Sequence, residues 1–225
     1  MKDIQSLYTK HPAREYRQAF DLVGSWLNHT DGAKLCLLSS SVFAVELLKR
    51  CPHQLDLIGT DGFDAAGFIS RSLDWNWGEL KLGSIDVQDN KYEIIIWVEP
   101  ITSQPYLISR QLCRVALPKA KLFVISPGLL NRFIPSGVML SHNEQKLLIP
   151  YQFTQTLKNT GWQIESTMGF HGPRSILWNG FYRLSTQMGR LDWADKLLFV
   201  MRSSYQESGR LWWLSPLSII CASAN

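Results

Sequence analysis

The chain has 225 residues, of which 45% are hydrophobic and 19% are charged, so it can bury a sizeable core and wholesale disorder is excluded. Its net charge of +4 comes from scattered basic residues, and no run of them indicates a nucleic-acid-binding stripe. Nine tryptophans are many for this length, and we expect most of them in the core.

The four cysteines indicate neither a metal site nor a disulfide framework. Each lies in or beside an apolar stretch, and no two have CxxC spacing; they are Cys36, Cys51, Cys113 and Cys221. Buried free thiols are typical of a reducing compartment. The N-terminal residues lack the apolar core of a signal peptide, and no apolar run approaches the roughly 18 residues that span a bilayer. We therefore expect a cytoplasmic protein that binds no metal, no nucleic acid and no membrane.

Helices and short apolar strands alternate through the first part of the chain, a pattern that predicts a mostly parallel sheet with helices on both faces. The first helix is indicated by apolar residues at i, i+4, i+7 and i+11, and the strands by short apolar runs between polar residues. In chain order we predict a helix over 12–29, a strand over 34–38, a helix over 42–50, a strand over 55–61, a helix over 63–73, strands over 81–85 and 92–98, a helix over 104–116 and a strand over 121–126.

The alternation of predicted strands and helices stops after residue 127. Residues 129–150 show no clear period, and we expect a connecting loop. After it we predict a helix over 152–159, a strand over 162–168, a mainly helical and aromatic-rich stretch over 174–207, and a final strand over 211–222 that bends at Pro216.

Three segments, taken in order, resemble the class I S-adenosylmethionine-dependent methyltransferases. The run from Leu112 to Val124, LCRVALPKAKLFV, is similar to the family's RVLKPGG turn and the strand that follows it. The strand over 92–98, YEIIIWV, resembles the family's fourth strand, and Asp61 stands where an acid binds the cofactor ribose. The resemblance covers 34–126 and implies a doubly wound α/β fold with S-adenosylmethionine as the cofactor.

The turn after the first strand departs from this family. Glycines there normally let the backbone approach the cofactor and leave the next helix N-terminus open. Here the turn contains Ser39, Ser40 and Ser41, and the bulky Val42 and Phe43 follow it. Serine hydroxyls can bind a ligand, but the same serines can also cap the helix. We keep both interpretations: Ser39 and Ser41 as cofactor contacts, or as a helix N-cap.

Further residues at strand ends are candidates for the site. The resemblance implies that Asp86 accepts a hydrogen bond from the adenine amino group of the cofactor, and that Trp97 lines the cofactor pocket. Glu99, after the strand over 92–98, and His171, in a turn with two glycines and a proline, are candidate catalytic residues. Three of these residues have a plainer alternative: Asp86 as a loop residue, Trp97 as core, and His171 as the centre of a structural turn.

These observations predict a single methyltransferase-like domain over 1–225. Its parts are an N-terminal helix within 1–33, a cofactor-binding half over 34–126, and a partly helical, aromatic-rich substrate or lid half over 127–225 that includes the final strand. The resemblance implies methyl transfer to a small-molecule acceptor. The alternative, favoured by the glycine-free turn, is a non-catalytic methyltransferase-like module that has lost its cofactor and binds a protein partner. A dinucleotide-binding domain is disfavoured because GxGxxG is absent.

Overall fold

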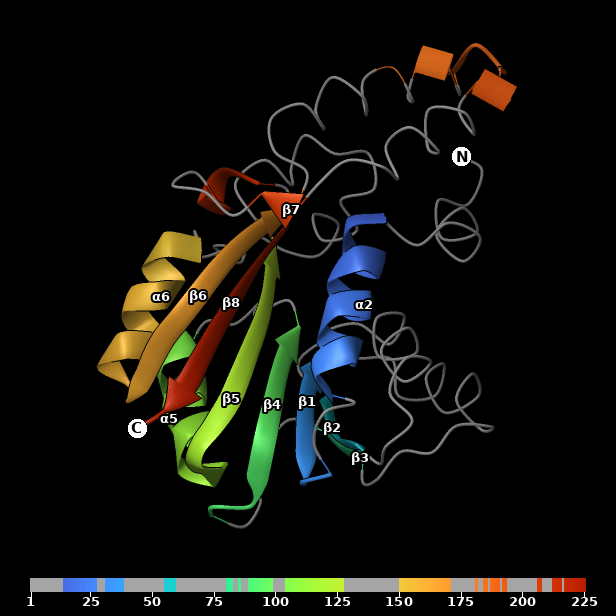
Figure 1. The fold of residues 1–225 in the computed structure, drawn as a ribbon. Coiled ribbons are helices and arrows are strands. Elements are labelled where there is room, and N and C mark those ends of the chain that lie inside the picture. Colours follow the sequence, from blue (N-terminus) through green and yellow to red (C-terminus); the bar gives the residue numbers. More distant parts are fainter. Residues whose placement is uncertain are drawn as a thin grey trace.

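In a computed structural model of the protein, an eight-stranded sheet has the strand order β3-β2-β1-β4-β5-β8-β6-β7 (Figure 1). The strands are β1 Lys34–Leu38, β2 Leu55–Gly59, β3 Leu80–Leu82, β4 Tyr92–Val98, β5 Ala116–Pro127, β6 Trp162–Phe170, β7 Gln206–Glu207 and β8 Leu217–Ala224. The helices whose bounds are described are α2 Arg14–Leu27, α5 Pro105–Val115 and α6 Pro150–Asn159, with a short 3-10 turn, η3, at Trp212–Leu214; Phe181, Leu184, Ser185, Gln187, Asp192 and Trp193 are also helical. The structure describes residues 14–27, 31–38, 55–59, 80–82, 85, 89–98, 104–127, 150–170, 181, 184–185, 187–190, 192–193, 206–207, 212–215 and 217–225.

Most of the sheet is parallel. β1 pairs in parallel with β2 and with β4, while β2 pairs with β3 and β4 with β5 in the same sense. β8 is antiparallel to both of its neighbours, β5 and β6, so β6 runs in the same direction as β1 to β5. The predicted mostly parallel α/β sheet is confirmed.

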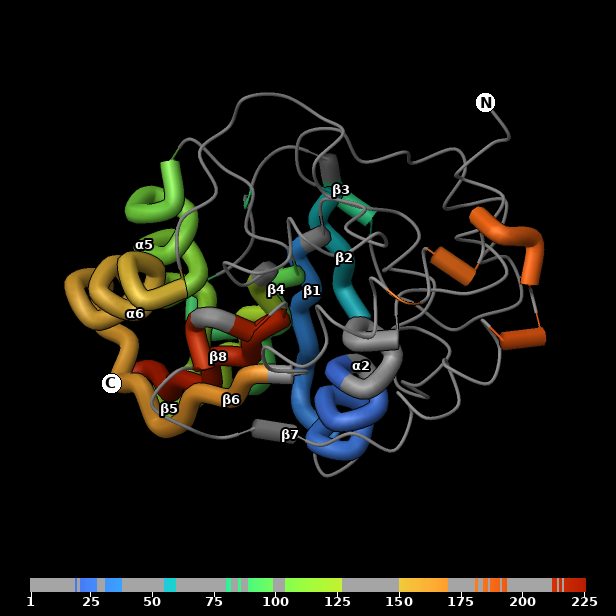
Figure 2. Tube along the Cα trace, turned by 90° about the horizontal axis from the view of Figure 1, so that it is seen from above, coloured from blue at the N-terminus to red at the C-terminus, as the bar shows by residue number. Residues whose placement is uncertain are grey.

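The two faces of the sheet are covered by different helices. On one face, Ala19, Val23 and Leu27 of α2 pack on alternate strand residues such as Cys36 and Ile96. On the other face, residues of α5 and α6 pack on the intervening residues of the same strands, which include Leu35, Leu37 and Ile95. Because β1 and β4 are buried on both sides, they are apolar almost without interruption, as central parallel strands are. Figure 2 shows α2 on one side of the sheet and α5 with α6 on the other.

The predicted strands over 34–38 and 92–98 coincide with β1 and β4, but other boundaries differ. β5 begins at Ala116 rather than 121, because Ala116 already pairs with Tyr92 across a register shift. The prediction of a strand from 211 was wrong at its start. Residues 212–214 form η3 instead, whose first carbonyl accepts the Ser215 N–H and the Ser218 hydroxyl, and β8 follows at 217.

The predicted helical stretch over 174–207 is also wrong at its end, where Gln206 and Glu207 form β7. This strand pairs antiparallel with Gly169 and Phe170 at the end of β6, and the sequence offers no alternation long enough to predict it. The helices expected over 42–50 and 63–73 lie outside the described residues, as does 129–149 of the predicted loop; Pro150 already belongs to α6.

Candidate functional site at the carboxyl edge of the sheet

The carboxyl ends of the central strands lie level with one another. Leu38, the last residue of β1, is aligned with Gly59 of β2 on one side and with Val98 of β4 on the other. Gly59 is in turn aligned with Leu82, the last residue of β3. Neighbouring strands lie about 4.8 Å apart, so the chain leaves β2, β1 and β4 within about 10 Å of one edge of the sheet. This is the upper edge in Figure 1.

The strand order reverses at β1. From β1 the chain continues to β2 and β3 on one side, and then returns to β4 and β5 on the other side. At such a reversal the connections leave in opposite directions, and a crevice opens outside the carboxyl ends of the two central strands. The β1–β4 position is therefore the candidate ligand site of this sheet.

The predicted site residues follow these strand ends along the chain. Ser39 and Ser41 come one and three residues after β1, and Asp61 comes two residues after β2. Glu99 comes directly after β4, and Asp86 comes four residues after β3. All five lie outside the described residues, so only the start of each segment is placed, and their roles remain predictions.

His171 also follows a strand that ends at this edge. Phe170 of β6 is aligned with Leu217 of β8, which is aligned with Pro127 at the end of β5. The chain thus leaves β6 level with the end of β5, with β8 between the two strands, about 14 Å along the edge from β4. His171 itself lies outside the described residues, and its catalytic role remains a prediction.

Trp97 is the one predicted site residue that the structure describes. Its indole is 2% exposed and packs edge-on against Phe153 of α6, with ring centroids 5.0 Å apart. It points to the face of the sheet that α5 and α6 cover. This is the placement expected of the core alternative, and a contact with a cofactor remains a prediction.

The β6 end of the same edge is closed by a tight contact that the sequence did not reveal. A Cβ on Gly169 would lie 2.3 Å from the Ser215 hydroxyl and 2.7 Å from the Trp212 carbonyl oxygen. That carbonyl accepts hydrogen bonds from the Ser215 N–H, at 3.1 Å, and from the Ser218 hydroxyl, at 3.1 Å. Only glycine at 169 lets η3 lie this close to β6, so residues 212–215 form a fixed wall beside the carboxyl edge.

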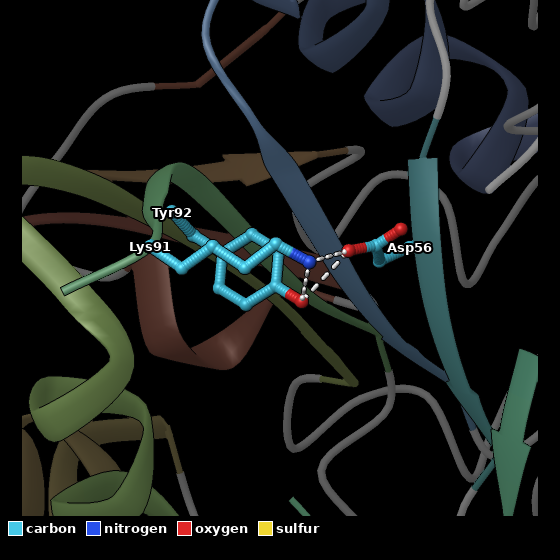
Figure 3. Close-up of polar contacts among 3 residues, drawn as sticks. All are labelled: Asp56, Lys91 and Tyr92. Atoms are coloured by element: carbon cyan, nitrogen blue, oxygen red, sulfur yellow. Dashed lines mark hydrogen bonds and ion pairs between the residues drawn. The ribbon is translucent and has the colours of Figure 1, made fainter. Parts of the chain in front are cut away.

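A polar cluster lies at the opposite, amino edge of the sheet, and the sequence did not indicate it. Asp56 of β2, Lys91 and Tyr92 meet across the start of β1 (Figure 3). The Lys91 ammonium lies 2.5 Å from Asp56 Oδ2, the Tyr92 hydroxyl donates to the same oxygen at 2.8 Å, and Lys91 Nζ donates to the Tyr92 oxygen at 3.2 Å. Lys34, at the same end of β1, is also buried, with 2% of its surface exposed.

The contacts within this cluster favour the protonated forms of Lys91 and Tyr92. Hydrogen bonding to the Asp56 carboxylate raises the pKa of Lys91 above its ordinary value. Burial, followed by the hydrogen bond to Asp56, raises the pKa of Tyr92 to about 12. Tyr92 therefore stays a neutral donor and Lys91 stays a cation at neutral pH. The cluster ties β4 to β2 across β1, at the opposite end of these strands from the candidate site.

Known proteins resemble this chain in structure but not in sequence. The sequence matches no known family profile and no curated protein. Among solved structures, the chain is similar to a SAM-dependent methyltransferase from Thermotoga maritima. The superposition covers 99% of this chain and 96% of the Thermotoga protein, with a TM-score of 0.60 and 9% sequence identity. The chain has the class I methyltransferase fold. A Haloferax volcanii protein, solved with the Trm112 methyltransferase activator, covers 94% of this chain over 90% of its own, with a TM-score of 0.56 and 12% identity.

The methyltransferase fold does not by itself fix the reaction. The [4+2]-cyclase SpnF is also similar, with a TM-score of 0.55 and 15% identity over 92% of this chain and 81% of its own. Within the part of the chain that the structure describes, no three metal-ligating side chains lie together, and no helix is long and apolar enough to cross a membrane.

Proposed function

We propose that this protein binds S-adenosylmethionine at the β1–β4 carboxyl edge and transfers its methyl group to a small-molecule acceptor. The observation that carries the proposal is the level alignment of Leu38, Gly59 and Val98 at the point where the strand order reverses. An elongated ligand, such as an adenosyl group with an amino-acid tail, would lie across the three strand ends at this edge. The segments that begin there contain the serines and the acid for such contacts.

The cofactor supplies a methyl group on a sulfonium that is already activated. The protein then has to hold donor and acceptor in line and exclude competing water, and this needs no fixed catalytic side chain. In the proposal, the Asp61 carboxylate accepts hydrogen bonds from both ribose hydroxyls, and the Ser39–Ser41 turn contacts the amino-acid end of the ligand. The wall formed by residues 212–215 would then limit the space for the acceptor at the β6 end of the edge. A small acceptor is favoured because the sequence has no basic stripe for a phosphate backbone.

One observation favours a second function, that of a non-catalytic module. The turn that follows β1 has no glycine, and Val42 and Phe43 add bulk where the methionine end of the cofactor would lie. A module of this kind would use the same fold to bind a protein partner. The Haloferax volcanii neighbour, solved with an activator protein, gives a precedent for such pairing within the fold.

Replacement of Asp61 by alanine tests the proposed site. Asp61→Ala removes both carboxylate acceptors, and a hydrogen bond to a charged group contributes about 1.5–3 kcal/mol, so we expect the affinity for S-adenosylhomocysteine to fall at least about tenfold. Isothermal titration calorimetry measures the affinity. Asp89→Ala is the matched control, because Asp89 is an exposed acid at the amino edge, 3.2 Å from Arg114, and its loss should leave binding unchanged.

Asp61 is not the ribose ligand if the Asp61→Ala protein binds as tightly as the wild type. If the wild-type protein is folded but does not bind, the proposal fails in favour of the non-catalytic module. Circular dichroism of each variant separates a binding defect from unfolding.

A further inference from the structure

The described residues within 181–193 include four large apolar side chains that are more than half exposed, namely Phe181, Leu184, Met188 and Trp193. Leu184 and Met188 are 53% and 65% exposed, and Phe181 is 55% exposed. Phe181, Leu184, Ser185 and Gln187 are helical, so the spacing of three and four residues puts the three apolar side chains on one face. We call this face, together with Trp193, the apolar stripe.

The helical turn beneath the stripe ends in a defined structure. The N–H of Met188 donates to the carbonyl of Leu184, and the N–H of Arg190 donates to the carbonyl of Ser185, both at 2.9 Å. Gly189 lies between them with a φ of +70°, a conformation that favours glycine. This six-to-one hydrogen bond across a left-handed residue is the Schellman C-terminus of a helix. The exposure of the stripe is therefore built into an ordered turn.

The end of the stripe combines an aromatic ring with a cation. Trp193 is 57% exposed, and the Arg190 guanidinium lies 5.9 Å from its ring centroid. An amphipathic indole beside an arginine is typical of side chains that lie at the level of lipid headgroups. The surrounding sequence is cationic as well: residues 174–210 contain six Lys or Arg and three Asp or Glu, a net charge of +3 out of +4 for the whole chain.

We propose that the apolar stripe docks on an anionic lipid bilayer. Leu184, Met188 and Phe181 would enter the boundary between headgroups and acyl chains, while Arg190 at the end of the stripe and the net positive charge of the sequence over 174–210 favour anionic headgroups. A surface-bound helix needs no spanning segment, so the proposal is compatible with the lack of a membrane-crossing helix among the described residues. It revises the expectation, made from the sequence, that the protein has no membrane partner.

A second copy of the chain fits the stripe less well. Two copies joined here would bring two segments of net charge +3 together, and like charges across an interface disfavour binding. The stripe also consists of a few side chains from one short segment, whereas a stable protein interface takes about 20–30 residues from each partner.

A second exposed apolar region provides the control. Tyr106 and Leu107 of α5 are 48% and 49% exposed. Figures 1 and 2 show α5 on the opposite side of the molecule from the segments of 181–193, drawn in orange. An acidic substitution at Leu107 therefore makes the same charge change on an exposed apolar residue, 49% exposed against 53% for Leu184, far from the stripe.

The test is co-sedimentation of the full chain with vesicles of phosphatidylcholine alone, and of an equimolar mixture of phosphatidylcholine and phosphatidylserine. We expect binding to the anionic vesicles, weakened by salt as the Debye length falls to about 3 Å at 1 M. Met188→Glu should weaken that binding at least about tenfold, and Leu107→Glu should leave it unchanged. Leu184→Glu is a second variant, so that the result does not depend on the folding of one protein.

Several results would overturn the proposal. These are no binding of the wild type to anionic vesicles, equal binding to neutral vesicles, and an equal loss with Leu107→Glu. Dimerisation without lipid that Met188→Glu abolishes would identify a second copy as the occupant. Vesicle binding requires no methyl donor, so this test succeeds or fails independently of the proposed function.

Discussion

At the scale of single residues, the burial of Tyr92 and its hydrogen bond to Asp56 have a consequence for stability at high pH. The pKa of Tyr92 is raised to about 12 from 10.0, so the folded protein holds this proton more tightly than the unfolded chain does. The stabilisation is then fully present below pH 10 and is lost as the pH rises through 12. Lys91, whose pKa is also raised, contributes in the same direction, with its stabilisation lost at high pH.

Tyr92→Phe tests this linkage. Without the hydroxyl, the free energy of unfolding should fall less between pH 10 and pH 12 than in the wild type, by about 1–2 kcal/mol after allowance for screening. Urea unfolding at a series of pH values measures the difference. Tyr106→Phe is the matched control, since Tyr106 is 48% exposed on α5. A wild-type pH profile that matches the Tyr92→Phe profile would contradict the assigned cause.

Sequence patterns placed these residues in the correct elements but could not pair them. Asp56 interrupts an apolar strand, and Tyr92 opens the strongest strand of the chain, and both strands were predicted. Their contact spans β1, which lies between β2 and β4 only because of the strand order. Spacing along the chain carries no information on such a contact. The one available signal was the carboxylate of Asp56 within a buried run, since such a group requires a partner.

At the scale of elements, α5 and α6 are joined by a small polar network inside an apolar layer. The Trp162 indole N–H donates to the Ser109 carbonyl at 3.2 Å, and the hydroxyls of Ser109 and Thr160 lie 2.5 Å apart. Ser109 and Trp162 are both buried. The network links the start of β6 to α5, in addition to the apolar contacts that α5, α6 and β6 share.

Trp162→Phe should therefore destabilise the fold. The change leaves the Ser109 carbonyl without its indole donor and opens a small cavity, so we expect a loss of about 1–3 kcal/mol in the free energy of unfolding. Gln163→Ala, at the exposed neighbour on the same strand, should cost less than about 0.5 kcal/mol. Urea denaturation of both variants decides the matter, and equal losses would show that the network does not stabilise the α5–β6 contact.

Elements defined by local pattern were predicted well, and those defined by tertiary contacts were not. β1 and β4 stand out as short apolar runs, and their predicted bounds match the structure. The run LWWL at 211–214 looks equally strand-like, yet 212–214 form η3 because Gly169 gives room for this turn against β6. β7 has only two residues, which is too short for a periodic signal.

At the scale of the whole molecule, the order of the elements was enough to predict the fold although the sequence matches no known family profile. Alternating strands and helices admit few topologies, because parallel crossovers are right-handed and short. The location of the candidate site follows from the same topology, since four of the six described strands that run in one direction, β1 to β4, end level with a neighbour at one edge. The side chains that would bind the ligand follow those strands, and their roles rest on the family resemblance alone.

The most direct test of the central claim is calorimetric titration of the purified, folded wild-type protein with S-adenosylmethionine and S-adenosylhomocysteine. If the carboxyl edge at β1 and β4 holds the cofactor, both ligands should bind with micromolar dissociation constants, about −8 kcal/mol in binding free energy. The absence of binding to either ligand at millimolar concentration would contradict the claim and favour a non-catalytic module.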